Sequence, residues 1–273
     1  MSGDERRVVL ITGASSGIGQ ACARLLAARE MRVFGTSRRA DGLAGEAFEG
    51  VVMDVCDDGS VTRAVERVLE VAGRIDVLIN NAGYALAGAV EDTSITEAQR
   101  QLDTNLIGVL RVTKAVLPGM RARGKGLIVN VGSLGGVVGM PFQGVYSASK
   151  FALEGLTEAL RHELRGFGVW VTIVEPGDVR TQITDNRVIA EGAAGSEYAG
   201  AFEKVMRICE KEEREGPEAM VVAELIGRIV RARGEPRVRY AVGRVGQTVV
   251  VWAKRVLPAG VFEWALGVYF GVR

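Results

Sequence analysis

A tyrosine and a lysine stand four positions apart in the segment Tyr146-Ser147-Ala148-Ser149-Lys150. On a helix this spacing places both side chains on one face. A free tyrosine has a pKa of about 10 and is a poor base at neutral pH, but a neighbouring ammonium group favours its phenolate form. Such a pair can exchange a proton with an alcohol or a carbonyl oxygen. The same spacing also occurs on ordinary helix surfaces, so its meaning depends on its neighbours.

A glycine-rich loop, Gly13-Ala14-Ser15-Ser16-Gly17-Ile18-Gly19, follows the apolar run 8–11 and precedes a helical pattern. Gly13 allows a tight turn, Gly17 lets the backbone approach a pyrophosphate, and Gly19 lets the helix pack on the strand. The free N–H groups of a helix N-terminus attract phosphates. We therefore predict a dinucleotide site, the alternative being a plain strand-to-helix turn. Its predicted residues are Gly13, Ser15, Ser16, Gly17, Ile18 and Gly19.

The second apolar run ends in Ser37-Arg38-Arg39, without the carboxylate that binds the ribose 2′-hydroxyl of NAD. A guanidinium group suits a 2′-phosphate. We therefore predict that NADP(H) is preferred, with Arg38 and Arg39 able to pair with the phosphate, Ser37 and Arg38 as cofactor-binding residues, and NAD(H) as the alternative cofactor. The competing interpretation is a pair of solvated surface arginines.

Short apolar runs alternate with helical patterns along the chain. The runs contain no polar alternation, so both faces of each strand should be buried, as in a parallel sheet between helices. The sequence predicts an α/β fold: a Rossmann-like, doubly wound parallel sheet of about seven strands in one domain, 1–273. The expected strands are 8–11, 31–36, 50–55, 75–79, 126–131, 169–174 and 238–242, and the expected helices 18–29, 60–72, 96–123, 146–165, 198–214 and 217–233.

Composition excludes several classes of function. Lys and Arg total 34 against 33 for Asp and Glu, so attraction to nucleic acid is not expected. Three distant cysteines and one histidine, His162, predict no disulfide framework and no metal site. Such cysteine usage fits a reducing compartment, and the charged start, residues 1–7, lacks a signal-peptide pattern, so we expect a cytoplasmic protein.

Further motifs make the pattern specific. Asn80-Asn81-Ala82-Gly83 follows the fourth run, Ser133 lies thirteen residues before Tyr146, and Pro176-Gly177 follows the sixth run. With Asn105 and Thr181, these motifs appear in order over about residues 7–185. The chain resembles the short-chain dehydrogenase/reductase family. Gly132 is a small departure, because many relatives carry a serine there.

The resemblance implies a catalytic role for four residues. Tyr146 would be the general acid/base, and Lys150 would bind the nicotinamide ribose and lower the pKa of the tyrosine. Ser133 would polarise the substrate oxygen, and Asn105 would hold a water in a proton relay. The hydride would pass between the nicotinamide and a substrate carbon.

The resemblance also implies further cofactor contacts. Asp54 and Val55 would bind the adenine, and three residues after the fourth strand would support the adenine ribose. Residues after the sixth strand would line the nicotinamide amide. The residues after the fourth strand are Asn81, Ala82 and Gly83. Those after the sixth strand are Pro176, Gly177, Val179 and Thr181.

The length after Pro176 resembles reductases and dehydrogenases of steroids, retinoids and other lipids. Residues 180–215, including a glycine-rich loop over 180–200, would form a lid over the substrate, with Ser133, Met140, Phe142 and Tyr146 binding it. An apolar rim suggests a hydrophobic substrate, although these residues could instead only pack the lid. The alternatives are a 3-ketoacyl-thioester reductase and a non-catalytic NADP-binding sensor.

The apolar C-terminal extension, 246–273, is too interrupted to span a bilayer. Packing in the core or in an interface is the favoured interpretation, and covering the substrate entrance or a peripheral membrane contact are the alternatives. The family resemblance also implies a homo-oligomer.

Overall fold

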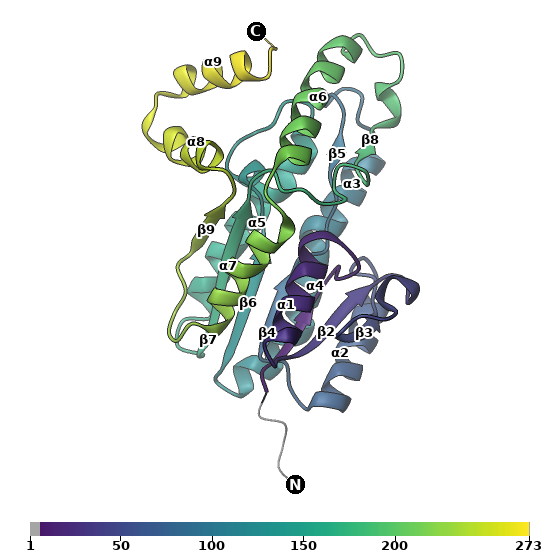
Figure 1. Ribbon diagram of the computed structural model, residues 1–273, viewed down its shortest axis with the longest axis vertical. Coiled ribbons are helices and arrows are strands. Elements are labelled where there is room, and N and C mark those ends of the chain that lie inside the picture. Colours follow the sequence, from purple (N-terminus) through teal and green to yellow (C-terminus); the bar gives the residue numbers. More distant parts are fainter. Residues whose placement is uncertain (1–5, 273) are drawn as a thin grey trace.

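The computed structural model describes residues 6–272. Its centre is a parallel sheet of seven strands in the order β3-β2-β1-β4-β6-β7-β9 (Figure 1). The chain crosses over after β3 and returns to β4 beside β1, which is the doubly wound arrangement that the apolar runs predict. The strands are β1 (Val8–Ile11), β2 (Arg32–Ser37), β3 (Glu49–Val52), β4 (Val77–Asn80), β6 (Gly126–Val131), β7 (Val169–Pro176) and β9 (Arg239–Val242).

Helices cover both faces of the sheet. On one face α1 (Gly17–Ala28) and α7 (Ala219–Arg231) pack against apolar side chains such as Val9 and Ile79. On the other, α2 (Asp58–Ala72), α4 (Gly108–Ala122) and α5 (Gly144–Glu163) cover side chains such as Leu10 and Ile128. Since β1, β4 and β6 contribute to both layers, their continuous apolar sequence is explained by burial on both sides.

The predicted helix 96–123 is wrong in one respect that matters for the site. It is divided into α3 (Ile95–Leu102) and α4 by a π-helical turn, Asp103–Ile107, which contains Asn105. In a π turn the hydrogen bonds reach one residue further, so the regular helical ladder is interrupted. The apolar periodicity continues through the turn and could not indicate it.

The other boundaries lie within three residues of the prediction, and two of the differences have a visible cause. β3 ends at Val52 rather than at 55, because a turn begins in which the amide of Cys56 donates to Asp54 Oδ1 (2.9 Å). Pro217 lies before α7 instead of in its first turn, and its carbonyl accepts a hydrogen bond from the amide of Arg180 (2.9 Å).

The segment 180–215 contains more structure than a glycine-rich loop. Its strand β8 (Val188–Ile189) pairs in parallel with β5 (Leu86–Ala87), and its second half forms α6 (Ala199–Glu215). The C-terminal extension forms two helices, α8 (Val245–Val256) and α9 (Ala259–Tyr269). In Figure 1, α6, α8 and α9 gather at one end of the molecule. No helix within residues 6–272 combines the length and apolar character needed to cross a membrane.

Candidate active site

The glycine loop provides a backbone cradle between β1 and α1. Gly13 and Gly17 have positive φ angles of 66° and 55°. A Cβ atom on Gly19 would lie 2.3 Å from the carbonyl oxygen of Gly13, so only glycine allows this approach. Ser16 is the N-cap of α1 and its side chain makes no capping hydrogen bond. The loop therefore presents main-chain N–H groups at a helix N-terminus, which fits the phosphates of a dinucleotide.

Asn81 holds the loop against β4. Its Nδ2 donates to the carbonyl oxygens of Thr12 and Gly13, both at 3.0 Å. In return the Thr12 hydroxyl accepts hydrogen bonds from the amides of Asn81 and Ala82, both at 2.9 Å. Thr12 is a supporting residue that the sequence prediction did not include in the site.

The residues predicted at the adenosine end lie at the carboxyl ends of β2 and β3. Arg38 is exposed, and it has no ion-pair partner among the described residues, whereas Arg39 pairs with Asp41 at 3.6 Å. Asp54 is half-buried two residues beyond β3, and Val55 packs against Gly108. A free guanidinium group at this edge fits a 2′-phosphate.

The first residues of the lid touch the glycine loop. The amide of Gly17 donates to Gln182 Oε1 at 3.1 Å, and a Cβ on Gly17 would lie 3.4 Å from Thr181. Val179 is buried in the core next to β7. Pro176 and Gly177, at the end of β7, therefore bring the predicted nicotinamide segment onto the cradle.

Tyr146, Ser133 and Lys150 come together as predicted. Tyr146 and Lys150 lie one turn apart on α5, and the Lys150 Nζ is 5.9 Å from the centre of the tyrosine ring. Ser133 caps the short turn after β6 and lies beside the tyrosine, because a Cβ on Gly135 would be 3.3 Å from Ser133 Oγ and 3.2 Å from the Tyr146 ring. The Lys150 ammonium donates to the carbonyl oxygen of Val131 at 3.0 Å. Three groups able to handle a proton therefore meet where β6 and α5 converge.

Burial controls the proton affinity of this group. It raises the pKa of Tyr146 above its ordinary value, although the hydrogen bond with Ser133 acts in the opposite direction. Burial also lowers the pKa of Lys150 to about 8, although the charge of Glu154 raises it. The expected lowering of the tyrosine pKa by Lys150 is therefore outweighed here by the removal of water. A phenol that keeps its proton at neutral pH is suited to donate it.

Asn105 is held in the π turn by its side chain. Its Nδ2 donates to Tyr84 O (3.0 Å) and to Ser149 Oγ (3.1 Å), and its Oδ1 accepts from the amide of Tyr84 (3.1 Å). Ser149 is adjacent to Lys150 in the sequence, so the structure brings Asn105 near the group formed by Tyr146, Ser133 and Lys150. A Cβ on Gly83 would lie 3.0 Å from Asn105 Oδ1, which explains the glycine there.

Met140 and Phe142 lie beneath the lid. They belong to an apolar cluster with Met206 and Cys209 of α6 and with Phe270 beyond α9. The ring of Phe142 makes edge-on contacts with Phe202 at 5.8 Å between ring centres. Both residues therefore pack against the lid helix α6, as one interpretation expects.

Sequence reasoning missed several polar residues near Tyr146. The charges of Glu213, Asp178 and Arg187 all act on its phenol. Arg187 and Glu213 form an ion pair, and both side chains are almost fully buried. No motif marked them, because burial of a lid residue depends on the contacts of α6 and not on its own sequence pattern.

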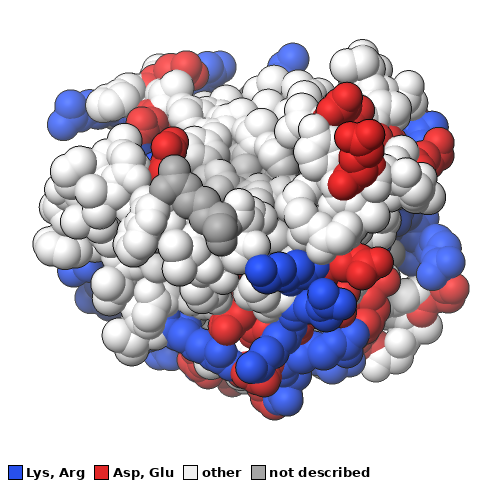
Figure 2. All heavy atoms as spheres, turned by 90° about the horizontal axis from the view of Figure 1, so that it is seen from above, with Lys and Arg blue, Asp and Glu red and all other residues white. Residues whose placement is uncertain are grey.

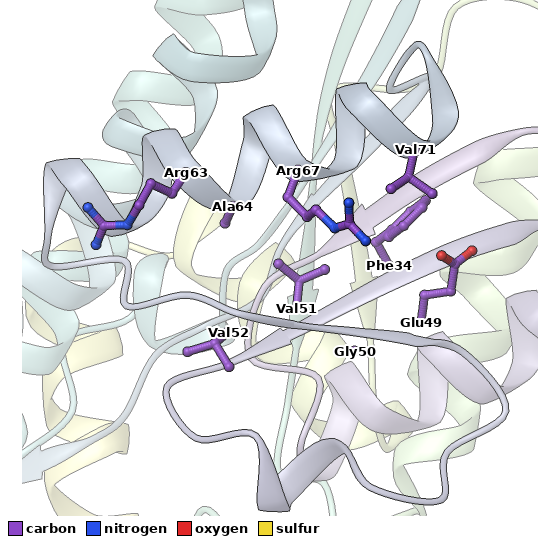
Figure 3. A pocket seen from close by; sticks show the side chains of 9 residues that line it. All are labelled: Phe34, Glu49, Gly50, Val51, Val52, Arg63, Ala64, Arg67 and Val71. Atoms are coloured by element: carbon purple, nitrogen blue, oxygen red, sulfur yellow. The ribbon is translucent and has the colours of Figure 1, made fainter.

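A groove elsewhere on the molecule holds none of the predicted site residues. It lies between α2 and β3, with Arg63 and Arg67 along one side and Glu49 on the other (Figure 3). Glu49 pairs with Arg32 at 2.8 Å and Arg67 with Glu70 at 3.7 Å. Glu49 and Arg67 are therefore paired with residues outside the groove lining, whereas no ion pair of Arg63 is found among the described residues.

Two known proteins are similar to this chain over much of its length. A 3-ketodihydrosphingosine reductase from Bacteroides thetaiotaomicron is 43% identical over 98% of this chain and 99% of its own. Human retinol dehydrogenase 8 is 40% identical over 68% of this chain and 62% of its own.

Solved structures agree with the fold. A short-chain dehydrogenase from Streptomyces avermitilis has a TM-score of 0.84 and 32% identity, covering all of both chains. A Burkholderia phymatum relative in complex with NAD has a TM-score of 0.80, 27% identity and 93% and 95% coverage. A serine dehydrogenase complexed with NADP+ has a TM-score of 0.76, 27% identity and 88% and 95% coverage.

The family signature described as short chain dehydrogenase matches residues 7–192, from the first strand to the lid. This range includes the glycine cradle and the group around Tyr146. The chain belongs to the short-chain dehydrogenase/reductase family of nicotinamide-dependent oxidoreductases.

Proposed function

We propose that the protein is an NADP(H)-dependent oxidoreductase that interconverts a carbonyl group and an alcohol on a hydrophobic substrate. One observation carries this proposal. The Tyr146 phenol is buried, lies beside Ser133, and shares α5 with Lys150. This group lies at the edge of the sheet that also holds the glycine cradle.

The chain contributes binding and proton handling. When bound, the nicotinamide supplies or accepts the hydride. Tyr146 donates its phenolic proton to the substrate oxygen in reduction and takes it back in oxidation. Ser133 orients that oxygen through its hydroxyl. Lys150, with its lowered pKa, returns a proton to the phenol, and Asn105 would hold the water that resupplies Lys150.

The preference for NADP(H) rests on Arg38. No described carboxylate pairs with it, and β2 ends without an acidic residue. A 2′-phosphate would gain a charge-assisted contact there, whereas the 2′-hydroxyl of NAD finds no acceptor at this position. NAD(H) remains the alternative cofactor.

The hydrophobic substrate rests on the apolar cluster under the lid and on the named relatives. Met140 and Phe142 belong to this cluster, and the amide of Met140 donates to the hydroxyl of Ser147 at 3.1 Å, next to Tyr146 in the sequence. Two relatives are named for 3-ketodihydrosphingosine and retinol, which are both lipids. We therefore propose a steroid-, retinoid- or lipid-like substrate, ahead of a 3-ketoacyl thioester.

A cofactor-binding sensor without turnover is the alternative from another class. The presence of Asn105, Ser133, Tyr146 and Lys150 in one group argues against it. The deciding experiment measures oxidation of NADPH and NADH at 340 nm with long-chain ketones, retinal and a ketosteroid. We expect turnover with NADPH and at least one lipid carbonyl. Binding of NADPH without turnover on any of them would favour the sensor.

We further propose two partners beside the substrate. The first is a second copy of the chain, as in a homo-oligomer. The second is a lipid surface, contacted by the exposed side of α8 and α9, which we test below. Neither nucleic acid nor a metal ion enters the proposal.

A further inference from the structure

Five charged side chains gather beneath the lid: Asp178, Arg187, Glu212, Glu213 and Arg244. We call them the lid charge cluster. Asp178 follows directly after the Pro176-Gly177 pair at the end of β7, Glu212 and Glu213 belong to α6, and Arg244 caps α8. Four of the five are paired. Arg187 binds Glu213, and the Arg244 Nη1 lies 3.0 Å from a Glu212 carboxylate oxygen.

Asp178 is the member without a basic partner within ion-pair distance among the described residues. Its contacts are with the amide side chain of Gln247, whose Nε2 donates to Asp178 Oδ2 at 2.5 Å and whose Oε1 accepts from the Asp178 amide at 3.2 Å. Burial, with the charges of Glu213 and Glu212, raises the pKa of Asp178 to about 6, although the charges of Arg187 and Arg244 act in the opposite direction. Burying a carboxylate away from water without an ion-pair partner costs free energy, and a bound cation would offset that cost.

Arg187 provides a second, independent sign of a missing ligand. Its side chain is only 3% exposed, and its Nε is buried without an acceptor among the described residues. Its partner Glu213 also accepts a hydrogen bond from the Thr184 hydroxyl at 2.6 Å. The cluster therefore contains both an unpaired carboxylate and an unused donor. Buried donors in proteins nearly always find an acceptor.

The cluster lies beside the phenol of Tyr146. Glu213 is one helical turn from Cys209 on α6, and the Cys209 sulfur accepts a hydrogen bond from Gln143 Nε2 at 3.6 Å. Gln143 is the N-cap of α5, three residues before Tyr146. The charges of Glu213, Asp178 and Arg187 also affect the pKa of the phenol itself, after its burial and the Ser133 hydrogen bond. A ligand held by the cluster would thus sit close to the reacting oxygen.

We propose that the lid charge cluster is a subsite for a protonated amine next to the reacting carbonyl, with Asp178 as the carboxylate that binds it. The inference rests on the proposed reduction of a lipophilic ketone and narrows its substrate to a long-chain 2-amino ketone. With three carboxylates and two guanidinium groups, the cluster has one uncompensated negative charge. Arg187 Nε would donate to a hydroxyl on the same head group, and the apolar cluster around Phe142 and Met206 would take the chain.

The test compares three ketones of equal chain length: 3-ketodihydrosphingosine, its N-acetyl derivative, and the ketone without the nitrogen. The variants are Asp178→Asn, which keeps an oxygen acceptor for Gln247, and the matched control Asp185→Asn. Asp185 is an exposed lid residue that pairs with Arg214 at 3.5 Å. We expect the wild type to prefer the free amine in kcat/KM, and Asp178→Asn to reduce that preference about 10- to 100-fold, as for loss of a charge-assisted hydrogen bond. The control should keep the preference.

A binding measurement makes the test independent of turnover. A long-chain 2-amino alcohol should raise the thermal unfolding midpoint more than the alcohol without the amine, and Asp178→Asn should remove this difference. Equal kcat/KM for the three ketones in the wild type would overturn the amine subsite while leaving the carbonyl reductase intact. If Asp178→Asn lowered kcat/KM equally for all three ketones, the role of Asp178 would be structural and not that of an amine ligand. No turnover on any ketone would overturn the proposed function, and the binding measurement would then still decide the subsite.

Discussion

At the scale of single residues, the environment decides what an ordinary side chain can do. Tyr146 has a raised pKa because it is buried, and Lys150 has a lowered pKa for the same reason. One phenol therefore keeps its proton at neutral pH, while its neighbouring amine gives up a proton more readily than in water. This pair is suited to deliver a proton and then restore it, which is the chemistry that a carbonyl reduction needs.

The first prediction concerns the phenol. Tyr146→Phe removes the proton donor but keeps the ring. We therefore expect kcat to fall by about 10³-fold or more, as for the loss of a general acid. NADPH binding, measured by fluorescence, should persist. Tyr240→Phe is the control. Tyr240 lies on the edge strand β9, and its hydroxyl accepts a hydrogen bond from the amide of Arg237. A fully active Tyr146→Phe enzyme would exclude the proposed role.

The second prediction concerns cofactor choice. Arg38→Asp introduces the carboxylate that binds a ribose 2′-hydroxyl and repels a 2′-phosphate, so the ratio of kcat/KM for NADPH to that for NADH should fall at least tenfold. Arg67→Asp makes the same charge change in the groove between α2 and β3, which holds none of the predicted cofactor residues. The hypothesis fails if the wild type already prefers NADH.

At the scale of elements, buried charges join α5 to the sheet. Arg239 of β9 faces three carboxylates: Glu154 at 2.8 Å, Glu175 at 3.3 Å, and Glu158. Glu154 and Glu175 each have one buried oxygen without a hydrogen-bond partner among the described residues. A single cation cannot neutralise these groups, so one carboxyl of the pair holds a proton. Burial, with the charge of Glu154, raises the pKa of Glu175 to about 7.

The third prediction follows from that raised pKa. Between about pH 4.5 and 7 the unfolded chain has lost the Glu175 proton while the folded chain keeps it, so the stability of the folded state falls as the pH rises. Glu175→Gln cannot lose a proton and should be more stable than the wild type at pH 8 by about 1–3 kcal/mol. The measurement is urea unfolding at pH 5 and pH 8.

Glu158→Gln provides the control, since its side chain is 49% exposed. Its stability should follow that of the wild type across this range. If the gain in stability of Glu175→Gln over the wild type is no larger at pH 8 than at pH 5, neither Glu175 nor Glu154 holds an extra proton in the folded protein.

At the scale of the whole molecule, the site and an apolar surface lie at the same end. Exposed residues recur on α8 at Val245, Val249, Trp252 and Val256, and on α9 at Val261, Trp264 and Val268. Figure 2 shows a broad area of this end without charged side chains, which gather mainly toward its edges. The opposite side of the same helices is packed: Phe270, directly after α9, is buried against α6, and Lys254 lies 4.8 Å from the ring centre of Phe151. The extension thus combines the favoured packing with an exposed apolar side.

The fourth prediction concerns that exposed side, which we expect to contact a lipid surface. Tryptophans with apolar neighbours favour the membrane interface. Trp252→Ser with Trp264→Ser should reduce co-sedimentation with phosphatidylcholine vesicles several-fold, without a change in NADPH binding. Trp170→Ser is the control, because that exposed tryptophan lies near the start of β7, at the amino ends of the strands. A wild type that stays in the supernatant at every lipid concentration would contradict this contact.

The sequence alone determined the order of the strands along the chain, the family, and the group of Tyr146, Lys150 and Ser133. It could do so because apolar runs, glycines and fixed spacings are local signals. The roles of the predicted residues in binding and catalysis stay predictions, although their placement agrees with the motif.

Tertiary structure alone decided the break at Asn105, the burial that sets the pKa of the phenol, and the charges of Asp178, Arg187 and Glu213 beside it. These residues come from the end of β7 and from the lid, and nothing in their own sequence distinguishes them from solvated charges. Burial is a property of what packs around a side chain, and here that packing is made by helices that are distant in the sequence.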